Sequence, residues 1–339
     1  MTSTTAPASG HTADAYRAKR VLVTGGLGFI GSNLAIALVQ GGAEVTVLDA
    51  LIPQHGGNHY NVETVRSRLH VEVADMRDTA ALEPLVVDKD FIFHLAGQVS
   101  HGDSMRDPEL DLGVNCVATI RLVEACRRLS PSAILINTST RQVYGRPLTV
   151  PVDEHHPVDP IDVNGINKLA AEYYHLLYHR VYGLRSVVLR LTNTYGPRQQ
   201  ITNDRQGMAG VFLCRALRGQ DLKLFGTGRQ VRDFNYVDDV IEALLLAGIT
   251  PDCHGKLFNL GATENHSLLE FCAILRELCG IQYEVVPFPA DKKIIDIGDY
   301  YGRFTRFQEA TGWTPRIGLV EGLTRSVQFF RQHAAHYLV

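Results

Sequence analysis

Three kinds of feature are missing from this chain, and each absence narrows what the protein can be. No apolar run reaches the roughly 18 residues that a membrane-spanning helix needs, so no membrane partner is expected. Neither sign of charge dominates, because 33 Lys and Arg face 36 Asp and Glu, and no nucleic-acid partner is expected. No internal repeat or low-complexity linker interrupts the 339 residues.

Metal-binding patterns are also missing. The six cysteines are scattered and form no CxxC pair, so we interpret them as reduced packing residues of a cytoplasmic protein. His55 and His59 have the i, i+4 spacing of helical ligands, but Gly56 and Gly57 lie between them and no third ligand is near. We interpret both as exposed loop histidines and expect no metal.

The first 18 residues differ from the rest in composition. Residues 1–18 are rich in Ser, Thr and Ala and carry no apolar core of the kind found in a signal peptide. We expect them to form a disordered tail. The whole chain is 45% hydrophobic and 20% charged, which is ordinary for a globular protein with a large core in one domain or two.

The clearest positive signal is the stretch VLVTGGLGFIG, residues 21–31. Its apolar start is typical of a buried parallel strand, and the apolar spacing from Phe29 onward is typical of a helix. A glycine turn between them brings backbone N–H groups and the positive end of a helix to one point, where a pyrophosphate fits. Gly25 permits the turn, Gly28 lets the phosphates approach, and Gly31 lets the helix pack closely on the strand.

An acidic residue follows at the expected distance. A second apolar strand, Glu44–Leu48, ends at Asp49, about 20 residues on, where a carboxylate would hold a ribose 2′-hydroxyl. The glycines match the dinucleotide fingerprint in two registers, starting at Gly25 or at Gly26, and the surrounding pattern of strand, turn, helix, strand and acid makes the signal specific. Because a carboxylate repels a 2′-phosphate, the predicted cofactor is NAD rather than NADP.

Strands alternate with helices as far as residue 191. Further strands are expected at 69–73, 91–95, 133–137 and 186–191, and helices at 111–129 and 165–182. This order predicts an α/β fold with a Rossmann-type doubly wound parallel sheet. The polar residues that end these strands should converge on one cofactor, because ligands of such sheets lie at the carboxyl ends of the strands.

The pattern changes after Leu191. Helices are expected at 208–217, 237–247, 267–279 and 320–333, and short strands at 257–260 and 282–286. We therefore predict a smaller α/β C-terminal substrate domain formed by 192–230 and 263–339. The cofactor domain comprises 19–191 and a returning segment at about 231–262.

Several motifs along the chain resemble one protein family. They are the glycine turn with Asp49, HLA at 94–96, TSTRQVYG at 138–145, Lys168, RLTNTYGPR at 190–198, RDFNYVDD at 232–239 and FNLG at 258–261. Together they resemble the extended short-chain dehydrogenase/reductase family, and more narrowly its NAD-dependent sugar-nucleotide epimerases and dehydratases of the UDP-glucose 4-epimerase kind. The match runs from about Lys19 to the last helix, and it is much less specific for the substrate or reaction than for the family.

The resemblance implies an enzyme with tightly held NAD and a nucleoside diphosphate sugar in its cleft. The implied cofactor contacts are Gly25, Gly28, Phe29, Ile30, Gly31, Asp49, Asp75, Met76, Leu95, Ala96 and Lys168. The candidate substrate contacts are Gln98, Thr140, Arg141, Asn193, Leu224, Phe225 and Arg232. The guanidinium fork of Arg232 suits a diphosphate, although an ion pair with Asp233 is the alternative. A homodimer through the helices at 111–129 and 165–182 is also implied.

The catalytic triplet of this family is incomplete here. In the family a Ser or Thr holds the sugar oxygen, a Tyr moves the proton, and a Lys four residues later binds the nicotinamide ribose and favours the phenolate. By resemblance Thr140 and Lys168 take the first and last roles. The residue four before Lys168 is Asn164, whose amide has no proton to exchange near neutral pH. Asn164 either contacts the substrate or caps the helix that starts there, and the two roles are compatible.

Another group therefore has to accept the proton. His101 follows the fourth strand, near Asp103, and a histidine titrates in a suitable range. The alternatives for His101 are a plain loop residue or a hydrogen-bond donor. A water molecule that bridges Asn164 and Thr140 is a further option.

The two residues after Thr140 bear on the reaction. Arg141 and Gln142 stand where the family's 4,6-dehydratases carry acids and near where its decarboxylases commonly carry a Glu, so both reactions rank below epimerisation. Arg141 binds an anionic sugar substituent, or else it is a solvent-facing or ion-paired arginine. We predict an NAD-dependent epimerase with a transient keto intermediate and non-standard acid/base chemistry. The alternatives are an NAD-dependent sugar-nucleotide dehydrogenase or dehydratase, and a redox-impaired protein that binds NAD and a sugar nucleotide.

Overall fold

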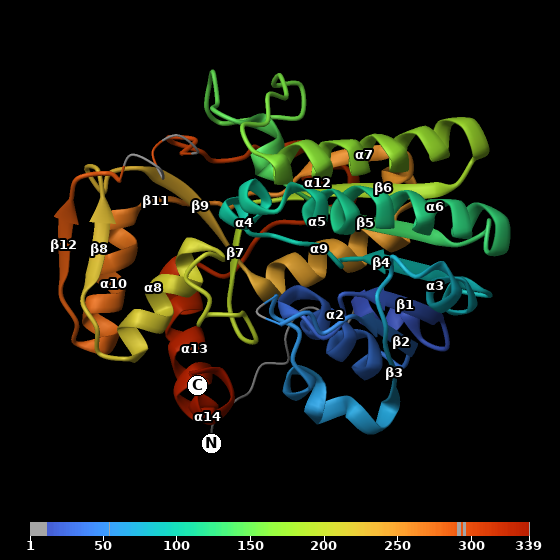
Figure 1. Ribbon diagram of the computed structural model, residues 1–339, viewed down its shortest axis with the longest axis horizontal. Coiled ribbons are helices and arrows are strands. Elements are labelled where there is room, and N and C mark those ends of the chain that lie inside the picture. Colours follow the sequence, from blue (N-terminus) through green and yellow to red (C-terminus); the bar gives the residue numbers. More distant parts are fainter. Residues whose placement is uncertain (1–11, 54, 290–292, 294–295, 339) are drawn as a thin grey trace.

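The computed structural model describes residues 12–338 except 54, 290–292 and 294–295. Figure 1 shows a large sheet with helices on both faces, and a smaller α/β unit around β8 and β12 at one side of it. Within the described residues, none of the helices combines the length and apolar character needed to cross a bilayer.

The large sheet has seven parallel strands in the order β10-β6-β5-β4-β1-β2-β3. Their bounds are β1 Arg20–Thr24, β2 Glu44–Asp49, β3 Leu69–Val73, β4 Phe91–His94, β5 Ile134–Thr140, β6 Arg185–Leu191 and β10 Lys256–Asn259. The strand order reverses between β1 and β4, which is where a doubly wound sheet opens a crevice for its ligand. The predicted Rossmann-type fold is confirmed.

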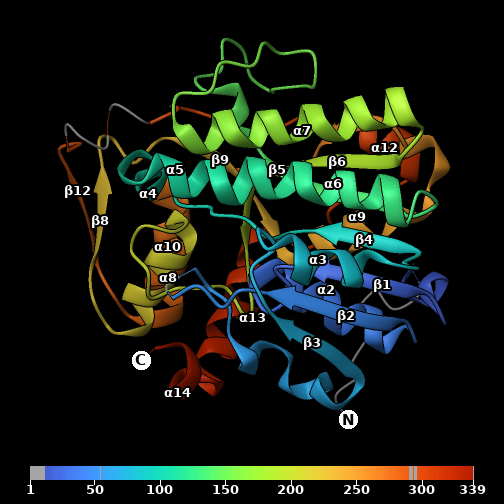
Figure 2. The ribbon, with the colours of Figure 1, turned by 45° about the vertical axis from the view of Figure 1, so that its right-hand side comes forward.

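Alternation of side chains along the strands explains why both faces are covered. Val21 and Val23 of β1 belong to the apolar cluster that contains α2 (Phe29–Gln40) and α9 (Val237–Ile249). Leu22 belongs to the opposite cluster, and all three side chains are fully buried. That second face carries α3 (Thr79–Val86), α6 (Ala118–Leu129) and α7 (Val163–Tyr182), and α6 and α7 lie side by side in Figure 2. Strands buried on both faces read as continuous apolar runs, as these do.

Residues 12–18 are part of the fold, which corrects the predicted disordered tail. The 3-10 turn η1 (Asp14–Tyr16) places the Tyr16 ring against Phe91, with 4.6 Å between ring centroids. The Tyr16 hydroxyl donates to the Leu245 carbonyl at 2.7 Å. One aromatic anchor in a stretch of small polar residues outweighs the average composition that predicted disorder. Residues 1–11 lie outside the described residues.

The helix predicted at 111–129 is longer and irregular. It runs through α5 (Pro108–Asp111), the π-helical segment η3 (Leu112–Val117) and α6. Pro108 stands in its first turn, and the Asp107 side chain caps it by accepting from the Leu110 N–H at 3.0 Å. Single π turns inside helices often mark functional sites.

The smaller unit combines two short sheets with several helices. β8 (Leu222–Phe225) pairs with β12 (Tyr283–Val286), and β9 (Val231–Tyr236) lies between β7 (Asn193–Tyr195) and β11 (Asn265–Ser267). The helices are α8 (Met208–Leu217), α10 (Leu268–Cys279), α13 (Leu319–Gln332) and α14 (Ala334–Tyr337). Three short elements pack on the larger unit instead: η2 (His59–Arg68) on α2, η5 (Pro251–Cys253) on α9 and α12 (Thr305–Thr311) on β10.

The boundaries between the two units differ from the predicted ones in two places. The returning segment was expected from about residue 231, but β9 pairs with β7 and β11, so the chain rejoins the large sheet only through α9 and β10. α12 was expected in the substrate domain, yet its Phe307 packs on Phe258 of β10 with 5.3 Å between ring centroids. Such exchanges depend on pairing between distant segments, which periodicity does not reveal.

We expect Tyr16→Ala to lower the free energy of unfolding by about 3–5 kcal/mol, because it empties a fully buried aromatic site. Tyr16→Phe keeps the ring and loses only the hydrogen bond to Leu245, so it should cost about 1 kcal/mol. Urea unfolding of both variants measures the difference. A Tyr16→Ala protein as stable as the wild type would show that the amino-terminal segment is not docked.

Candidate active site

A single pocket of about 1360 Å³ collects the carboxyl ends of the large sheet's strands. Its far wall comes from the smaller unit, through residues such as Lys223, Phe225 and Phe288. The volume exceeds the usual range for one small ligand, about 300–1,000 Å³. The pocket therefore has room for a dinucleotide and a second ligand beside it.

Nearly all of the site residues predicted from the sequence line this pocket. They are Gly25, Gly28, Phe29, Ile30, Gly31, Asp49, Asp75, Met76, Leu95, Ala96, His101, Thr140, Arg141, Asn164, Lys168, Asn193, Phe225 and Arg232. They come from strands and helices far apart in the chain, and the fold brings them to one cavity.

Gln98 and Leu224 do not line the pocket, which corrects their predicted substrate contacts. Alternation along β8 exposes Lys223 and Phe225 to the pocket and buries Leu224 completely on the other side. The Gln98 amide closes a turn instead. It donates to the Ser100 carbonyl at 2.9 Å and accepts from the Ser100 N–H at 2.6 Å.

The glycine turn has the geometry that a pyrophosphate requires. Gly25 has φ +68°, and a Cβ at Gly31 would stand 2.1 Å from the Gly25 carbonyl oxygen, so α2 packs directly on the turn. A Cβ at Gly28 would come within 4 Å of only that same oxygen, which leaves the start of α2 open to the pocket. Gly26 instead packs on Val47. The register that starts at Gly25 is therefore the one whose geometry suits an anion site.

Asp49 is held in place by two backbone hydrogen bonds. Its Oδ2 accepts from the Leu27 N–H at 3.0 Å and its Oδ1 accepts from the Leu51 N–H at 2.9 Å. Burial raises the pKa of Asp49, while these backbone hydrogen bonds oppose the rise. Each carboxylate oxygen keeps lone-pair capacity for a ribose hydroxyl. The glycine turn and Asp49 together fit NAD.

Lys168 reaches the same cavity from α7. Its Nζ donates to the Thr138 carbonyl at 3.2 Å, at the end of β5. Burial lowers its pKa to about 8, and the nearby carboxylates of Asp111 and Glu172 limit the fall. Lys168 thus has a position at the sheet edge that suits its predicted contact with the nicotinamide ribose.

Asn164 is buried, at 2% exposure, and its amide hydrogens are both used. Nδ2 donates to the Gln98 carbonyl at 2.8 Å and to Asp111 Oδ2 at 3.1 Å. Oδ1 has no donor within the described part of the chain, so Asn164 can offer a ligand only an acceptor. It does not cap α7. The cap is Asp162, whose Oδ1 accepts from the Gly165 N–H at 2.7 Å.

His101 is the first residue of the short helix α4 (His101–Arg106), and its Nδ1 lies 2.9 Å from Asp162 Oδ2. The ring N–H is not aligned on that oxygen, so the contact is an ion pair when the imidazole is protonated. The same oxygen accepts from Gln142 Nε2 at 2.9 Å. Burial raises the pKa of Asp162, but His101, the Gly165 N–H and Gln142 outweigh it and hold that pKa below its usual value.

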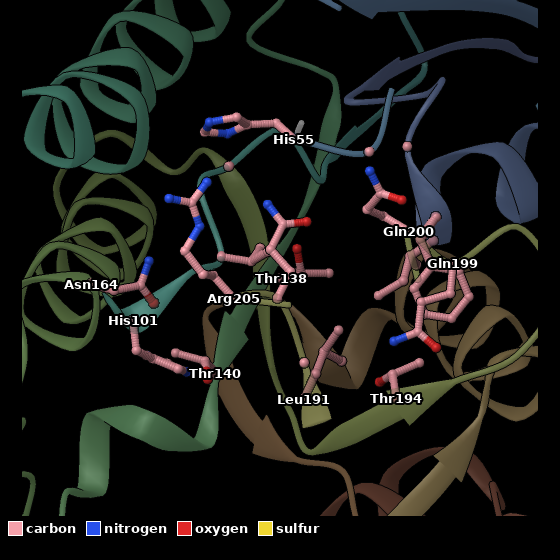
Figure 3. Close-up of a pocket in the computed structure, with 18 of the residues that line it drawn as sticks. His55, His101, Thr138, Thr140, Asn164, Leu191, Thr194, Gln199, Gln200 and Arg205 are labelled. Atoms are coloured by element: carbon pink, nitrogen blue, oxygen red, sulfur yellow. The ribbon is translucent and has the colours of Figure 1, made fainter. Parts of the chain in front are cut away.

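The polar groups of three elements meet in one part of the cavity. Figure 3 shows Asn164 of α7, His101 of α4 and Thr140 of β5 on one side, with Thr194, Gln199 and Gln200 on the other. Nδ1 of His101 is the ring nitrogen next to Asp162, and the residue also lines the pocket. A hydroxyl, an amide acceptor and an imidazole held by a carboxylate can together bind and deprotonate an alcohol.

Two arginines line the neighbouring wall. Arg232 Nη1 donates to the Gly298 carbonyl, and Nη2 lies 3.5 Å from Asp296 Oδ1, so its ion pair is with Asp296 rather than with Asp233. Burial lowers the pKa of Arg232 to about 10, and the positive charge of Arg141 adds to the effect. Arg141 Nη2 donates to Asn193 Oδ1 at 3.1 Å.

Sequence reasoning missed several lining residues that lie on loops. His55, expected to be exposed, is half-buried and lines the pocket, and burial lowers its pKa. Its loop meets the loop of Gln200, because a Cβ at Gly56 would be 3.3 Å from the Gln200 Cβ. Arg205 also lines the pocket. Loops carry no periodicity, and the RLTNTYGPR motif that ends shortly before Gln200 was the one available signal.

Among the described residues, no group of three or more His, Cys, Asp or Glu side chains is placed to hold a metal ion.

The chain is similar to known proteins along nearly its whole length. It is 33% identical to the putative UDP-glucose 4-epimerase of Methanocaldococcus jannaschii, over 92% of this chain and 99% of that protein. It is 35% identical to the UDP-glucose 4-epimerase of Mycolicibacterium smegmatis, over 92% and 98%.

Solved structures show the same likeness. The UDP-glucose 4-epimerase of Thermotoga maritima, solved with UDP-glucose, superposes with a TM-score of 0.83 at 32% identity, over 93% of this chain and 99% of that one. An epimerase from Methanothermobacter thermautotrophicus gives a TM-score of 0.90 at 25% identity, over 96% of both chains. Residues 21–261 match the model of the NAD dependent epimerase/dehydratase family. The chain therefore belongs to the NAD-dependent epimerase/dehydratase family, and NAD is its cofactor.

Proposed function

We propose that this protein is an NAD-dependent sugar-nucleotide epimerase that works through a transient keto sugar and uses His101 where its family uses tyrosine. One observation carries the proposal. The residue at the tyrosine position, Asn164, cannot move a proton, while the His101 imidazole, 2.9 Å from a buried carboxylate, lies on the same side of the pocket. The relatives named UDP-glucose 4-epimerases make uridine diphosphate sugars the first substrates to test.

Bound NAD supplies reversible hydride transfer. The protein has to hold the sugar hydroxyl and manage its proton. Thr140 holds the reacting oxygen, and Asn164 Oδ1 accepts a hydrogen bond from a sugar hydroxyl. His101 Nε2 takes the hydroxyl proton as the carbonyl forms and returns it when the carbonyl is reduced from its opposite face. The alcohol is regenerated with inverted configuration, so no external oxidant or reductant is consumed.

Asp162 makes this assignment chemically reasonable. Its side chain is fully buried, and a buried carboxylate needs charged or hydrogen-bonding partners. The Gly165 N–H and the Gln142 amide fix its two oxygens, so its position does not depend on His101. Such a carboxylate orients the imidazole and stabilises the cation that forms when His101 takes a proton.

Asn164 is built into the structure that positions His101. The Gln98 carbonyl accepts from both Asn164 and Asn115, at 2.8 and 3.0 Å, and Gln98 opens the turn that leads into α4. The Asn164 backbone N–H also donates to Ser104 Oγ of α4 at 3.2 Å. An asparagine that anchors the His101 segment in this way is part of a different mechanism rather than a lost tyrosine.

The remaining proposed contacts, with the diphosphate, the base and NAD, come from residues that line the pocket. We place the diphosphate near Arg232 and Asn193, and the base against Phe225, whose ring centroid is 5.7 Å from that of Phe288. We place the adenine of NAD near Asp75 and Met76, and the nicotinamide ribose near Lys168, with Leu95 and Ala96 as further cofactor contacts. The six cysteines are all unpaired, and we place the protein in the cytoplasm.

We expect His101→Gln to lower kcat for the best sugar nucleotide by about 10²–10⁴, because it removes the proton acceptor, with little change in substrate affinity. Asp162→Asn keeps the helix cap, since Asn caps as well as Asp, but loses the charge. It should lower kcat as well, because the carboxylate no longer stabilises the imidazolium that forms when His101 takes the proton. Epimer formation from UDP-, dTDP-, GDP- and CDP-sugars, followed by NMR and mass spectrometry, provides the rates.

A matched control is His155→Gln, a substitution at an exposed histidine outside the pocket, which should leave the rate unchanged. A His101→Gln enzyme with the wild-type rate removes His101 from the mechanism. A wild-type protein that binds sugar nucleotides without forming NADH or product would contradict the proposal and support the redox-impaired binding protein.

We expect Asn164→Tyr to reduce activity and stability together. The tyrosine removes one of two side-chain donors from the buried Asp111 carboxylate and one of two from the Gln98 carbonyl, at a cost of about 1–3 kcal/mol for the pair of lost hydrogen bonds. Asn167→Ala is the matched control, because Asn167 also donates to Asp111, at 2.8 Å, and does not line the pocket. It should lose stability and keep kcat. A strong rise of kcat in Asn164→Tyr would mean that the asparagine is a lesion.

We also propose a homodimer through α6 and α7. The exposed face of α7 carries a stripe of large apolar side chains at helical spacing: Ile166, Tyr173, Leu177 and Val181. Sedimentation analysis should therefore give a dimer, and the double substitution Leu177→Glu with Val181→Glu should give a monomer. A wild-type monomer at micromolar concentration would rule this interface out.

A further inference from the structure

We infer that Arg141 recognises a carboxylate on the substrate sugar, so that the preferred substrate is a nucleoside diphosphate uronic acid or a similarly carboxylated sugar. The inference rests on the proposed function and names its substrate class. It starts from the guanidinium of Arg141 in the pocket wall, a positive charge without an anionic partner among the described residues.

Arg141 lacks the partners that a buried guanidinium needs. Its Nη2 donates a hydrogen bond to the neutral amide oxygen of Asn193, at 3.1 Å. Nη1 is buried and has no acceptor within the described part of the chain, and no carboxylate there comes within ion-pair distance of the group. Burial lowers the pKa of Arg141, as expected of a desolvated cation. Buried charges in proteins are normally paired.

The acids that surround Arg141 are already committed to other groups. Asp233 accepts from the Thr192 hydroxyl and from the Gly302 N–H, the latter at 2.8 Å. Asp296 pairs with Arg232, and Asp162 faces His101. Their fields favour the charged form of Arg141, but none of them supplies the two oxygens that a guanidinium fork accepts. The missing partner is therefore an anion brought by a ligand.

The position of Arg141 selects the sugar rather than the diphosphate as the source of that anion. Arg141 directly follows Thr140, the hydroxyl that holds the reacting sugar oxygen in the proposed mechanism. Arg232, the diphosphate candidate, belongs to β9 of the smaller unit and shares the pocket wall with Phe225. The two cations raise the local positive potential together, but they approach the ligand from different elements.

The guanidinium is also held in place before any ligand arrives. Asn193 fixes one edge, and the plane lies over the Tyr300 ring, with 5.2 Å from the guanidinium carbon to the ring centroid. Tyr300 is itself buried, at 1% exposure. A planar, preorganised fork suits a planar carboxylate, whereas a neutral hydroxymethyl group offers a single oxygen and no charge.

The test compares binding of three ligands in the NAD-loaded His101→Gln protein, where turnover is suppressed. Calorimetry gives the affinities for UDP-glucuronate, UDP-glucose and UDP. We expect UDP-glucuronate to bind about 10- to 100-fold more tightly than UDP-glucose, as a charge-assisted hydrogen-bond pair predicts. If another nucleoside diphosphate binds more tightly than UDP, its glucose and glucuronate forms replace these probes.

Variants at Arg141 separate a carboxylate site from a phosphate site. Arg141→Gln should abolish the preference for the glucuronate and keep the affinity for UDP within about threefold, and Arg141→Lys should retain part of the preference. Arg232→Gln is the comparison, because it should weaken all three ligands alike. Thermal unfolding of each variant checks that it is folded, and the comparison of UDP-glucuronate with UDP-glucose in the His101→Gln protein does not depend on any Arg141 variant.

Two results overturn the inference. One is equal affinity for UDP-glucuronate and UDP-glucose. The other is an Arg141→Gln substitution that weakens binding of UDP as much as binding of UDP-glucuronate. Failure of the proposed function looks different, because the wild type would then keep the carboxylate preference and form no epimer. A protein that binds no nucleoside diphosphate contradicts both.

Discussion

The buried carboxylate of Asp162 is the interaction on which the rest of the site depends. One of its oxygens caps α7, and the other takes the Gln142 amide and faces His101. It therefore joins the helix that carries Asn164 and Lys168, the turn η4 (Arg141–Tyr144) that follows Thr140, and the helix that starts at His101. Because a fully buried charge is costly without partners, these three elements cannot separate without exposing or stranding it.

The charged groups around Asp162 follow the same principle, that a buried charge needs a partner. Asp111 is completely buried, and it is satisfied by the amides of Asn164 and Asn167, at 3.1 and 2.8 Å. Its charge in turn supports the Lys168 cation, whose pKa burial would otherwise lower further than about 8. Asp162, Asp111 and Lys168 thus each have a partner on another element. Arg141 departs from this rule, and for that reason it points to something that arrives with the substrate.

Much of the fold could be predicted from the sequence, because its signals are local. The apolar run of β1, the glycine turn and Asp49 lie within one βαβ unit, and each has a direct physical role in binding a dinucleotide. The alternation of strands and helices gave the parallel sheet for the same reason. Tyr16 was missed because a single anchoring ring is invisible in the average composition of a polar segment.

The site was harder to predict, because its decisive contacts join distant parts of the chain. The sequence DVNG offers two residues that can cap a helix, and the choice between Asp162 and Asn164 depends on where the helix starts. Nothing near His101 in the sequence indicates that Asp162 faces it. Leu224 was misplaced because a motif gives the position of a strand without its phase, and a shift of one residue reverses the side that each residue faces.

These contacts also bear on the proposal that His101 acts where the family uses a tyrosine. A Tyr and a Lys one turn apart work as a pair, because the cation favours the phenolate. In this protein the lysine is kept, and its charge is balanced by Asp111 and Glu172 instead of by a phenolate. In the proposed mechanism the proton-transfer group is His101 of α4, on a different element and 2.9 Å from a carboxylate of its own. The arrangement keeps Thr140 and Lys168 at the strand end that the cofactor requires, so the hydride and the proton can be handled by independently positioned parts of the fold. That separation is what allows Asn164 to become a structural link and an acceptor without removing the chemistry.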